Sequence, residues 1–406
     1  MANYKVEIGL DLTSSSLPFL LLDDPVKGIL GSTEYFLGGT TFYDITDDIV
    51  SFNVNRGKSS QLDRYNAGKA SITLNNMDRK YDPLYADGVY FGQIIPRRPI
   101  RISVDDERIF TGSIDDWDLA YSLSGLSIAA AIASDNTYLL ANQSLGSATQ
   151  TSQYTGARVN AILTNSQVDW PGDVREIDTG KTLLQADIID DNTNALQYLQ
   201  TVAETEPGSF FVNKDGFARF RDRWGYSATE ELIFSDDGAG IPYNNVKVIY
   251  GSELLYNQIT VKQKGGSTVQ ATDAESQEAY GILSYESNDL LMEQASDAAN
   301  MAIYLANKYS EPTYRFETLD VQLEKLNATQ KEKILALDLG DAVTVKFTPN
   351  QVGDPIVRSV EIIKLQHTVT VNTHVIKLGL GTLEGAAWKL SDAIFGKLSV
   401  GNALAY

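Results

Sequence analysis

The sequence predicts a mainly β chain of the α+β class, with two β-barrel-like domains flanking an α+β middle region and an arm at each terminus. Three observations support this fold class. Alternating apolar and polar residues recur toward both ends, helical spacing is concentrated in the middle, and Ser- and Gly-rich sequence precedes the first alternating run. With 406 residues, the chain is long enough for about two to four domains.

The composition excludes several classes of protein. Lys and Arg number 33 against 53 Asp and Glu, and the resulting net charge of −20 disfavours duplex DNA and anionic membranes as direct partners. The absence of cysteine rules out disulfides, thiol nucleophiles and cysteine-bound metal clusters. Because the N-terminus lacks a leader pattern and apolar runs fall short of the roughly 20 residues of a membrane helix, we expect cytoplasmic synthesis without membrane insertion.

The first half of the chain divides into an arm and a β domain. Residues 1–46 carry Ser, Gly and Thr clusters around a short apolar run, which predicts an N-terminal arm. Residues 47–135 contain several alternating segments separated by turn residues, which predicts the first β-barrel-like domain. Asp105–Glu107 falls between two of these segments and is expected at a hairpin tip. The alternating segments are 49–55, 69–74, 98–104, 108–114 and 126–131.

The middle of the chain mixes helices with strands. Within residues 136–240, apolar spacing predicts a helix that starts after the polar run 190–192 and ends at Pro207. A hairpin is expected around Lys214–Gly216, since Asp-Gly favours a tight turn. Residues 241–312 are predicted to hold strands and one long helix over 288–309.

The last part of the chain returns to alternation. Residues 313–383 are predicted to form the second β-barrel-like domain, and residues 384–406 a C-terminal tail. A nine-residue segment of the N-terminal arm, 22–30, is similar in sequence to segment 390–398 of the tail, because Leu, Asp, Gly and Leu recur in register in both. The two segments are either docking segments that bind neighbouring proteins or similar by chance. Their candidate contact residues are Asp24, Pro25, Gly28, Asp392 and Gly396.

A search for catalytic residues assigns none. The two histidines, His367 and His374, are seven apart and would point to opposite faces of a continuous strand, unless a hairpin at Asn372-Thr373 brings them together. Adjacent acidic residues are typical of turns and solvated surfaces, and no phosphate-binding loop or hydrolase motif is present. We therefore expect no catalytic residue, no cofactor and no metal site.

One basic cluster stands out in this acidic chain. Arg97, Arg98 and Arg101 lie in the segment Pro96–Arg101, where the prolines favour extended backbone. With few other basic residues nearby, an ion pair between subunits is a better interpretation than contact with nucleic acid. These three arginines are the remaining candidate assembly contacts.

The segment 54–83 reads VNRGKSSQLDRYNAGKASITLNNMDRKYDP, and it is followed by Gly92 and the Pro96–Arg101 strand. This pattern resembles the minor tail proteins of phages with long non-contractile tails. The resemblance continues in order over most of the chain, through 156–158, 170–171, 190–199 and 204–216. It implies a tail-tip or baseplate hub similar to those of contractile phages, in which three subunits each contribute two β-barrel domains to a ring with pseudo-sixfold symmetry.

The same resemblance implies partners and a location. The homotrimer would join a hexameric distal tail protein ring to threefold tip or fibre proteins, with the tape measure protein inside, at the distal end of the tail in the virion. DNA would pass transiently through a lumen, which the net charge of −20 suggests is acidic. The alternatives are a receptor- or carbohydrate-binding tail protein and a tail-associated cell-wall hydrolase.

Overall fold

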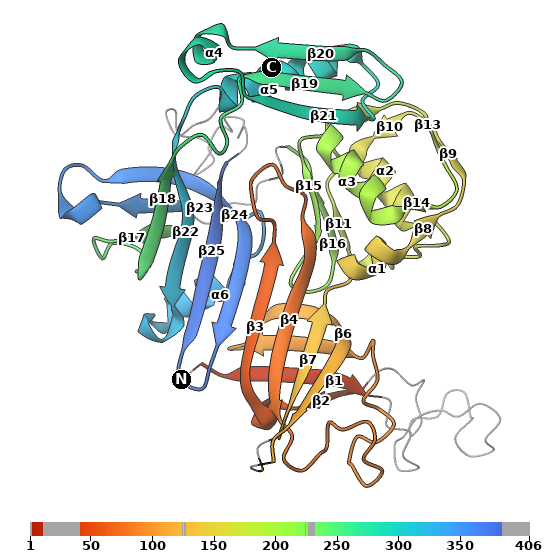
Figure 1. Ribbon diagram of the computed structural model, residues 1–406, viewed down its shortest axis with the longest axis vertical. Coiled ribbons are helices and arrows are strands. Elements are labelled where there is room, and N and C mark those ends of the chain that lie inside the picture. Colours follow the sequence, from red (N-terminus) through yellow and green to blue (C-terminus); the bar gives the residue numbers. More distant parts are fainter. Residues whose placement is uncertain are drawn as a thin grey trace.

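The computed structural model describes residues 2–10, 41–123, 125, 127–223, 225 and 232–383 (Figure 1). This part of the chain is mainly β with a few helices, which confirms the predicted fold class. Within these ranges, no helix combines the length and apolarity needed to span a membrane. The candidate residues of both terminal segments, Asp24, Pro25, Gly28, Asp392 and Gly396, lie outside the described residues.

The first β region is a curved antiparallel sheet with the strand order β2-β1-β5-β6-β7-β4-β3. Asp105 and Asp106 adopt positive φ angles of 49° and 68° between β5 and β6, which confirms the predicted hairpin tip. Residues 4–10, which the sequence predicts in the N-terminal arm, instead form a strand paired with β5. The elements are β1 (Tyr4–Leu10), β2 (Thr41–Asp44), η1 (Thr46–Asp48), β3 (Ile49–Gly57), β4 (Asn66–Asn75), β5 (Pro99–Val104), β6 (Glu107–Tyr121) and β7 (Ser127–Ser134).

The second β region contains most of the last quarter of the chain. Its long strand β24 pairs with β25 on one side, and on the other side its first half pairs with β23. The elements are β17 (Ile233–Ser235), β18 (Asn245–Tyr250), β22 (Tyr314–Gln322), η3 (Leu323–Lys325), α6 (Ala328–Ala336), β23 (Ala342–Phe347), η4 (Pro349–Gln351), β24 (Ile356–Val369) and β25 (His374–Thr382).

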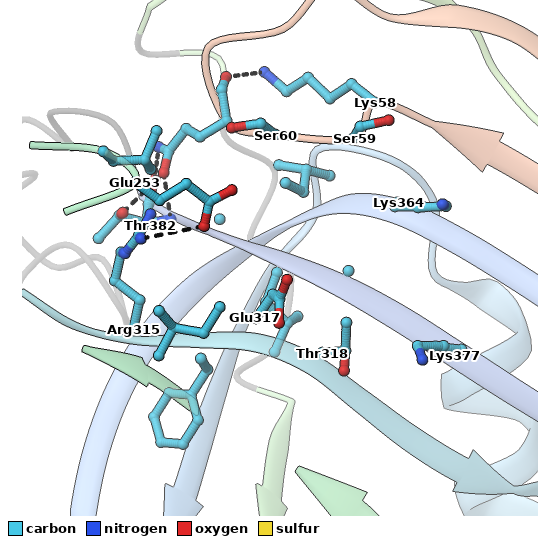
Figure 2. Close-up of a pocket in the computed structure, with 18 of the residues that line it drawn as sticks. Lys58, Ser59, Ser60, Glu253, Arg315, Glu317, Thr318, Lys364, Lys377 and Thr382 are labelled. Atoms are coloured by element: carbon cyan, nitrogen blue, oxygen red, sulfur yellow. Dashed lines mark hydrogen bonds and ion pairs between the residues drawn. The ribbon is translucent and has the colours of Figure 1, made fainter. Parts of the chain in front are cut away.

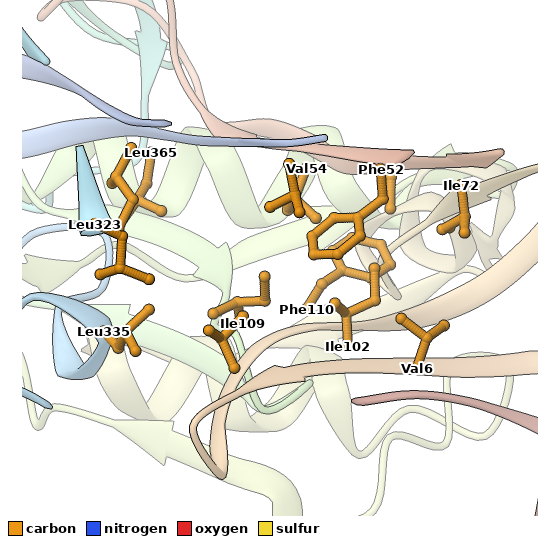
Figure 3. Close-up of a cluster of buried hydrophobic side chains, with 14 of the residues drawn as sticks. Val6, Phe52, Val54, Ile72, Ile102, Ile109, Phe110, Leu323, Leu335 and Leu365 are labelled. Atoms are coloured by element: carbon orange, nitrogen blue, oxygen red, sulfur yellow. The ribbon is translucent and has the colours of Figure 1, made fainter. Parts of the chain in front are cut away.

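The two β regions are joined into one 13-stranded sheet. The second half of β24 pairs antiparallel with β3, from Lys364 opposite Gly57 to Val369 opposite Phe52. One hydrophobic core runs beneath both regions, and Figure 3 shows Leu365 of β24 and Val54 of β3 both pointing into it. This shared sheet is not foreseen in the two separate β domains that the sequence predicts. The two regions are called here the first and second sheet halves.

Two smaller cores lie outside this sheet. The first contains α3, which confirms the predicted helix, although the side chain that caps it is Asn194 and not a residue of 190–192. The hairpin β15–β16 confirms the prediction at Lys214–Gly216. The elements are α1 (Thr137–Asn142), β8 (Ser144–Leu145), β9 (Ala148–Gln150), β10 (Gln153–Tyr154), α2 (Thr155–Leu163), η2 (Gly172–Val174), β11 (Arg175–Ile177), β12 (Leu183–Leu184), β13 (Asp187–Ile189), β14 (Thr193–Asn194), α3 (Ala195–Thr205), β15 (Ser209–Val212) and β16 (Ala218–Arg221).

The third core packs one helix on a three-stranded sheet. The long helix predicted over 288–309 is correct only in its later part, because residues 284–290 form a strand that pairs parallel with β19. Pairing with a neighbouring strand thus overrides the helical spacing at the start of that segment. The elements are β19 (Gln258–Gln263), β20 (Thr268–Thr272), α4 (Ala274–Tyr280), β21 (Ser284–Leu290) and α5 (Ala295–Tyr309).

Candidate functional site

The segment that carries the resemblance, residues 54–83, forms a junction between three parts of the chain. Its first part is the end of β3 and the loop 58–65, called here the junction loop. Gly57 has a φ of +117°, and a Cβ atom at this position would lie 2.3 Å from the carbonyl oxygen of Ile363 on β24. Glycine is therefore required where the two sheet halves meet, both by the backbone angle and by the close approach.

Arg56 is the central residue of this junction. It is buried, and its guanidinium forms an ion pair with Asp338 at 2.7 Å and donates a hydrogen bond to the carbonyl oxygen of Val212 at 3.0 Å. Asp338 in turn accepts a hydrogen bond from the backbone N–H of Lys214 at 3.0 Å. Because these residues come from β3, from the segment before β23 and from the β15–β16 hairpin, one ion pair connects both sheet halves to the middle of the chain.

The electrostatics of Asp338 follow from this arrangement. Burial by itself raises the pKa of the carboxyl, but the charge of Arg56 and hydrogen bonds from two backbone N–H groups outweigh it and hold the pKa below its ordinary value. The carboxylate is therefore ionised in the folded protein at neutral pH. A second contact of the same kind lies nearby, where Arg221 pairs with Asp341 at 3.0 Å.

The junction loop is also attached to α3. Arg64 makes a two-pronged ion pair with Glu204, at 2.5 and 2.8 Å, and the ring of Tyr65 packs against Phe211 with centroids 4.9 Å apart. The amide of Gln200 donates to the carbonyl oxygen of Tyr65 at 3.0 Å. The loop thus carries contacts from the sheet to the helical part of the chain.

The second part of the segment, residues 76–83, closes one end of the first sheet half. The hydroxyl of Tyr81 donates to Asp48 at 2.6 Å, and Lys80 forms an ion pair with the same carboxylate at 2.6 Å. The side-chain oxygen of Asn76 accepts a hydrogen bond from the backbone N–H of Tyr81 at 3.0 Å. These residues fix a turn, so the structure gives them a folding role.

A groove opens on the sheet surface beside the junction loop (Figure 2). Its volume is about 190 Å³, and β22, β24 and β25 line it together with the loop. Arg315 and Glu253 pair across it at 3.7 Å. The remaining cationic side chains of its lining are Lys58, Lys364 and Lys377.

The three predicted arginine contacts are engaged within the chain. Arg97 forms an ion pair with Asp115 at 2.6 Å and lies over the ring of Tyr138. Arg98 is buried and donates to the carbonyl oxygen of Gln93 at 3.1 Å. Arg101 lies 3.6 Å from the centroid of the Phe42 ring. Each arginine therefore has its own partners in this chain, and the three do not share one binding site.

The two histidines form a buried pair, with Nδ1 of His367 lying 3.0 Å from Nε2 of His374. The strand is not continuous between them, so the hairpin that the sequence left open as the alternative is the one found: the chain turns between β24 and β25, and a hydrogen bond from Thr370 to Thr373 closes the turn. Burial lowers the pKa of both rings, that of His374 to about 4, and the proximity of His374 lowers the pKa of His367 further.

Among the residues that the structure describes, the histidine pair is not part of a larger group of metal-ligating side chains. Within the described ranges, no group of three or more His, Asp or Glu side chains is arranged to hold a metal ion. Sequence reasoning missed the buried pair, although the alternative of a hairpin at Asn372-Thr373 contained the signal for it.

Comparison with known proteins identifies the fold. No family model and no curated protein matches the sequence. Among solved structures, the 43 kDa tail protein of prophage MuSo2 from Shewanella oneidensis aligns over 94% of this chain and 99% of its own, with 12% identity and a TM-score of 0.59.

Two further tail proteins are similar. One from Neisseria meningitidis MC58 aligns over 93% of this chain and 96% of its own, with 11% identity and a TM-score of 0.60. A prophage tail protein from Listeria monocytogenes EGD-e aligns over 85% and 92%, with 15% identity and a TM-score of 0.50. The chain therefore has the fold of phage and prophage tail proteins.

Proposed function

We propose that this chain is a structural protein of a phage tail and forms the tail-tip or baseplate hub. The observation that carries the proposal is the likeness to tail proteins over nearly the full length of both chains, 94% and 99% for the Shewanella oneidensis protein. The shared sheet supports it, since each chain supplies two sheet halves in a fixed arrangement. Three chains would then supply six halves, which suits an adaptor between sixfold and threefold structures.

The proposed mechanism is mechanical. A closed ring of identical chains requires a head-to-tail interface, and the rotation between copies must be reproducible for the ring to close. The buried pair of Arg56 and Asp338 and the strand pairing of β3 with β24 hold the two halves at one angle. A rigid joint of this kind would let three copies define one ring.

The proposed partners follow from the hub position. A hexameric distal tail protein ring would bind one face of the homotrimer and tip or fibre proteins the other, with the tape measure protein in the lumen and DNA passing through during ejection. Both terminal segments, with Asp24 and Asp392, are proposed as clips onto neighbouring proteins. Arg97, whose side chain is 36% exposed, remains a proposed contact between subunits. We propose no catalytic role for the chain.

A cryo-EM reconstruction of the virion tail tip without imposed symmetry tests this function. Three copies in a closed ring between the tube and the tip are expected. Six copies would make the chain a distal tail ring, and a peripheral position would favour the receptor-binding alternative. Turnover of purified peptidoglycan by the isolated chain would instead support the cell-wall hydrolase.

A further inference from the structure

The face of the central strands that points away from the core has an unusual charge for this chain. The four neighbouring strands β25, β24, β3 and β4 span the joint between the two sheet halves (Figure 1). Strands β3, β4 and β25 contain no Asp or Glu, and the single acid of β24, Glu361, is buried. In a chain with 53 acids, the outer face of these four strands therefore carries no exposed carboxylate.

The same face carries lysines, amides and hydroxyls in register. One row crosses all four strands, because Lys377 pairs with Gln366, Gln366 with Asn55, and Asn55 with Lys69. The neighbouring row consists of Thr368, Asn53 and Ser71, and Lys364 lies on β24 on the other side of the first row, two residues before Gln366. We call this surface, with Lys58 at its edge, the polar sheet face.

The lysines of the polar sheet face are largely uncompensated. Within the part of the chain that the structure describes, Lys69 and Lys364 form no ion pair, whereas Lys377 forms a long one, at 4.0 Å, with Asp320 opposite it on β22. Figure 2 shows Lys58, Lys364 and Lys377 on one side of the groove, whose lining also includes Glu253 and Glu317. The surface is thus locally basic although the chain carries a net charge of −20.

We propose that the polar sheet face contacts the phosphate backbone of duplex DNA. Lys377 and Lys69 stand three strand spacings apart, about 14 Å, which is close to the roughly 12 Å width of the major groove and would let them reach phosphates on both strands. Amide and hydroxyl donors between them can bond phosphate oxygens without a carboxylate to repel the duplex. This inference rests on the proposed function, in which DNA passes the hub.

The small number of cations makes the contact weak, as sliding requires. Three lysines that neutralise about three phosphates give a slope of about −2.7 for log K against log salt, so affinity falls about 40-fold between about 50 and 200 mM salt. The proposal therefore requires the polar sheet face to line the lumen of the proposed ring.

Binding of a fluorescent duplex of about 20 base pairs, followed by anisotropy at about 50 mM salt, tests the proposal. The variant Lys69→Glu/Lys364→Glu/Lys377→Glu is expected to bind at least about tenfold more weakly than the wild-type chain. The matched control reverses three lysines elsewhere, Lys262, Lys325 and Lys331, and keeps the same net charge. The proposal is overturned if the wild-type chain does not bind, or if both variants lose affinity equally.

A second measurement locates the contact without removing a charge. Because the chain has no cysteine, Asn55→Cys carries a photoactivatable maleimide at a single place, and Ser267→Cys in the exposed β19–β20 turn serves as its control. Crosslinking of the duplex by the first variant and not by the second is expected. Equal crosslinking by the two variants would overturn the assignment of the contact to the polar sheet face.

The oligomeric mass of the same samples separates this inference from the proposed function. A trimer that fails to bind the duplex would contradict only the DNA contact. A chain that binds the duplex through the polar sheet face but never forms a trimer would contradict the hub and leave the contact standing.

Discussion

Replacing Arg56 by methionine tests whether one buried ion pair holds the two sheet halves and the middle of the chain together. Both side chains are buried, at 2% exposure for Arg56 and 8% for Asp338, so the variant leaves a carboxylate without a cation in the interior. Loss of one partner of such a pair costs about 3–5 kcal/mol of unfolding free energy. The carbonyl of Val212 loses its donor as well, which adds about 1 kcal/mol.

The assay is urea unfolding of the full chain, followed by tryptophan fluorescence and circular dichroism. Arg64→Met is the matched control, because the pair of Arg64 and Glu204 is 42% and 33% exposed and is expected to cost at most about 1 kcal/mol. Adding Asp338→Asn to the Arg56 variant removes the unpaired charge but keeps an acceptor for the backbone N–H of Lys214, so recovery of about 2 kcal/mol is expected. Equal destabilisation by the Arg56 and Arg64 variants would refute the reasoning.

Three further outcomes are expected. Gly57→Ala should lower the yield of folded protein sharply because its Cβ meets a backbone oxygen, whereas Gly265→Ala, at φ +69° with open space, should cost about 1 kcal/mol in thermal unfolding. Asp135 is buried between β7 and α1, where its carboxyl accepts hydrogen bonds from the backbone N–H groups of Gly68 and Thr137. Burial raises its pKa from 3.8 to about 6, so its contribution to stability is full below pH 3.8 and falls by about 3 kcal/mol as pH rises to 6. A flat stability profile of the wild type relative to Asp135→Asn over this interval would contradict this expectation. The pKa of His374 is lowered from 6.5 to about 4, so its contribution to stability is full above pH 6.5 and is lost as pH falls to 4. His374→Gln should reduce the loss of stability over this interval in denaturant titrations, and the part that remains comes from the buried His367.

Local sequence signals predicted the elements that local contacts determine. The Asp-Gly pair in the turn between β15 and β16, the two-residue tip at Asp105-Asp106, and the helix ending before Pro207 were all found where the spacing placed them. The segment 54–83 was recognised as a unit from its residues, but the buried contacts that explain its Arg and Gly were not predictable, because their partners lie elsewhere in the chain.

The errors share one cause. Residues 4–10 alternate weakly next to a Ser-rich stretch, and only their pairing with β5 shows that they belong to the sheet. The start of the helix predicted at 288 failed because β19 offers that segment a strand partner. The histidine pair depended on where the hairpin between β24 and β25 turns. In each case the local structure was decided by pairing with a strand that the segment's own residues do not specify.

By itself, the sequence determined the fold class, the absence of cysteine chemistry, the net charge of −20 and most strand positions, because periodicity records which side of each element is buried. Only the tertiary structure decided that β3 pairs with β24 and that Arg56 forms an ion pair with Asp338. It also decided that four neighbouring strands of an acidic chain share an outer face without an exposed carboxylate. The physical reason is that strand pairing joins residues some hundreds of positions apart, and alternation specifies a buried face without specifying the neighbour.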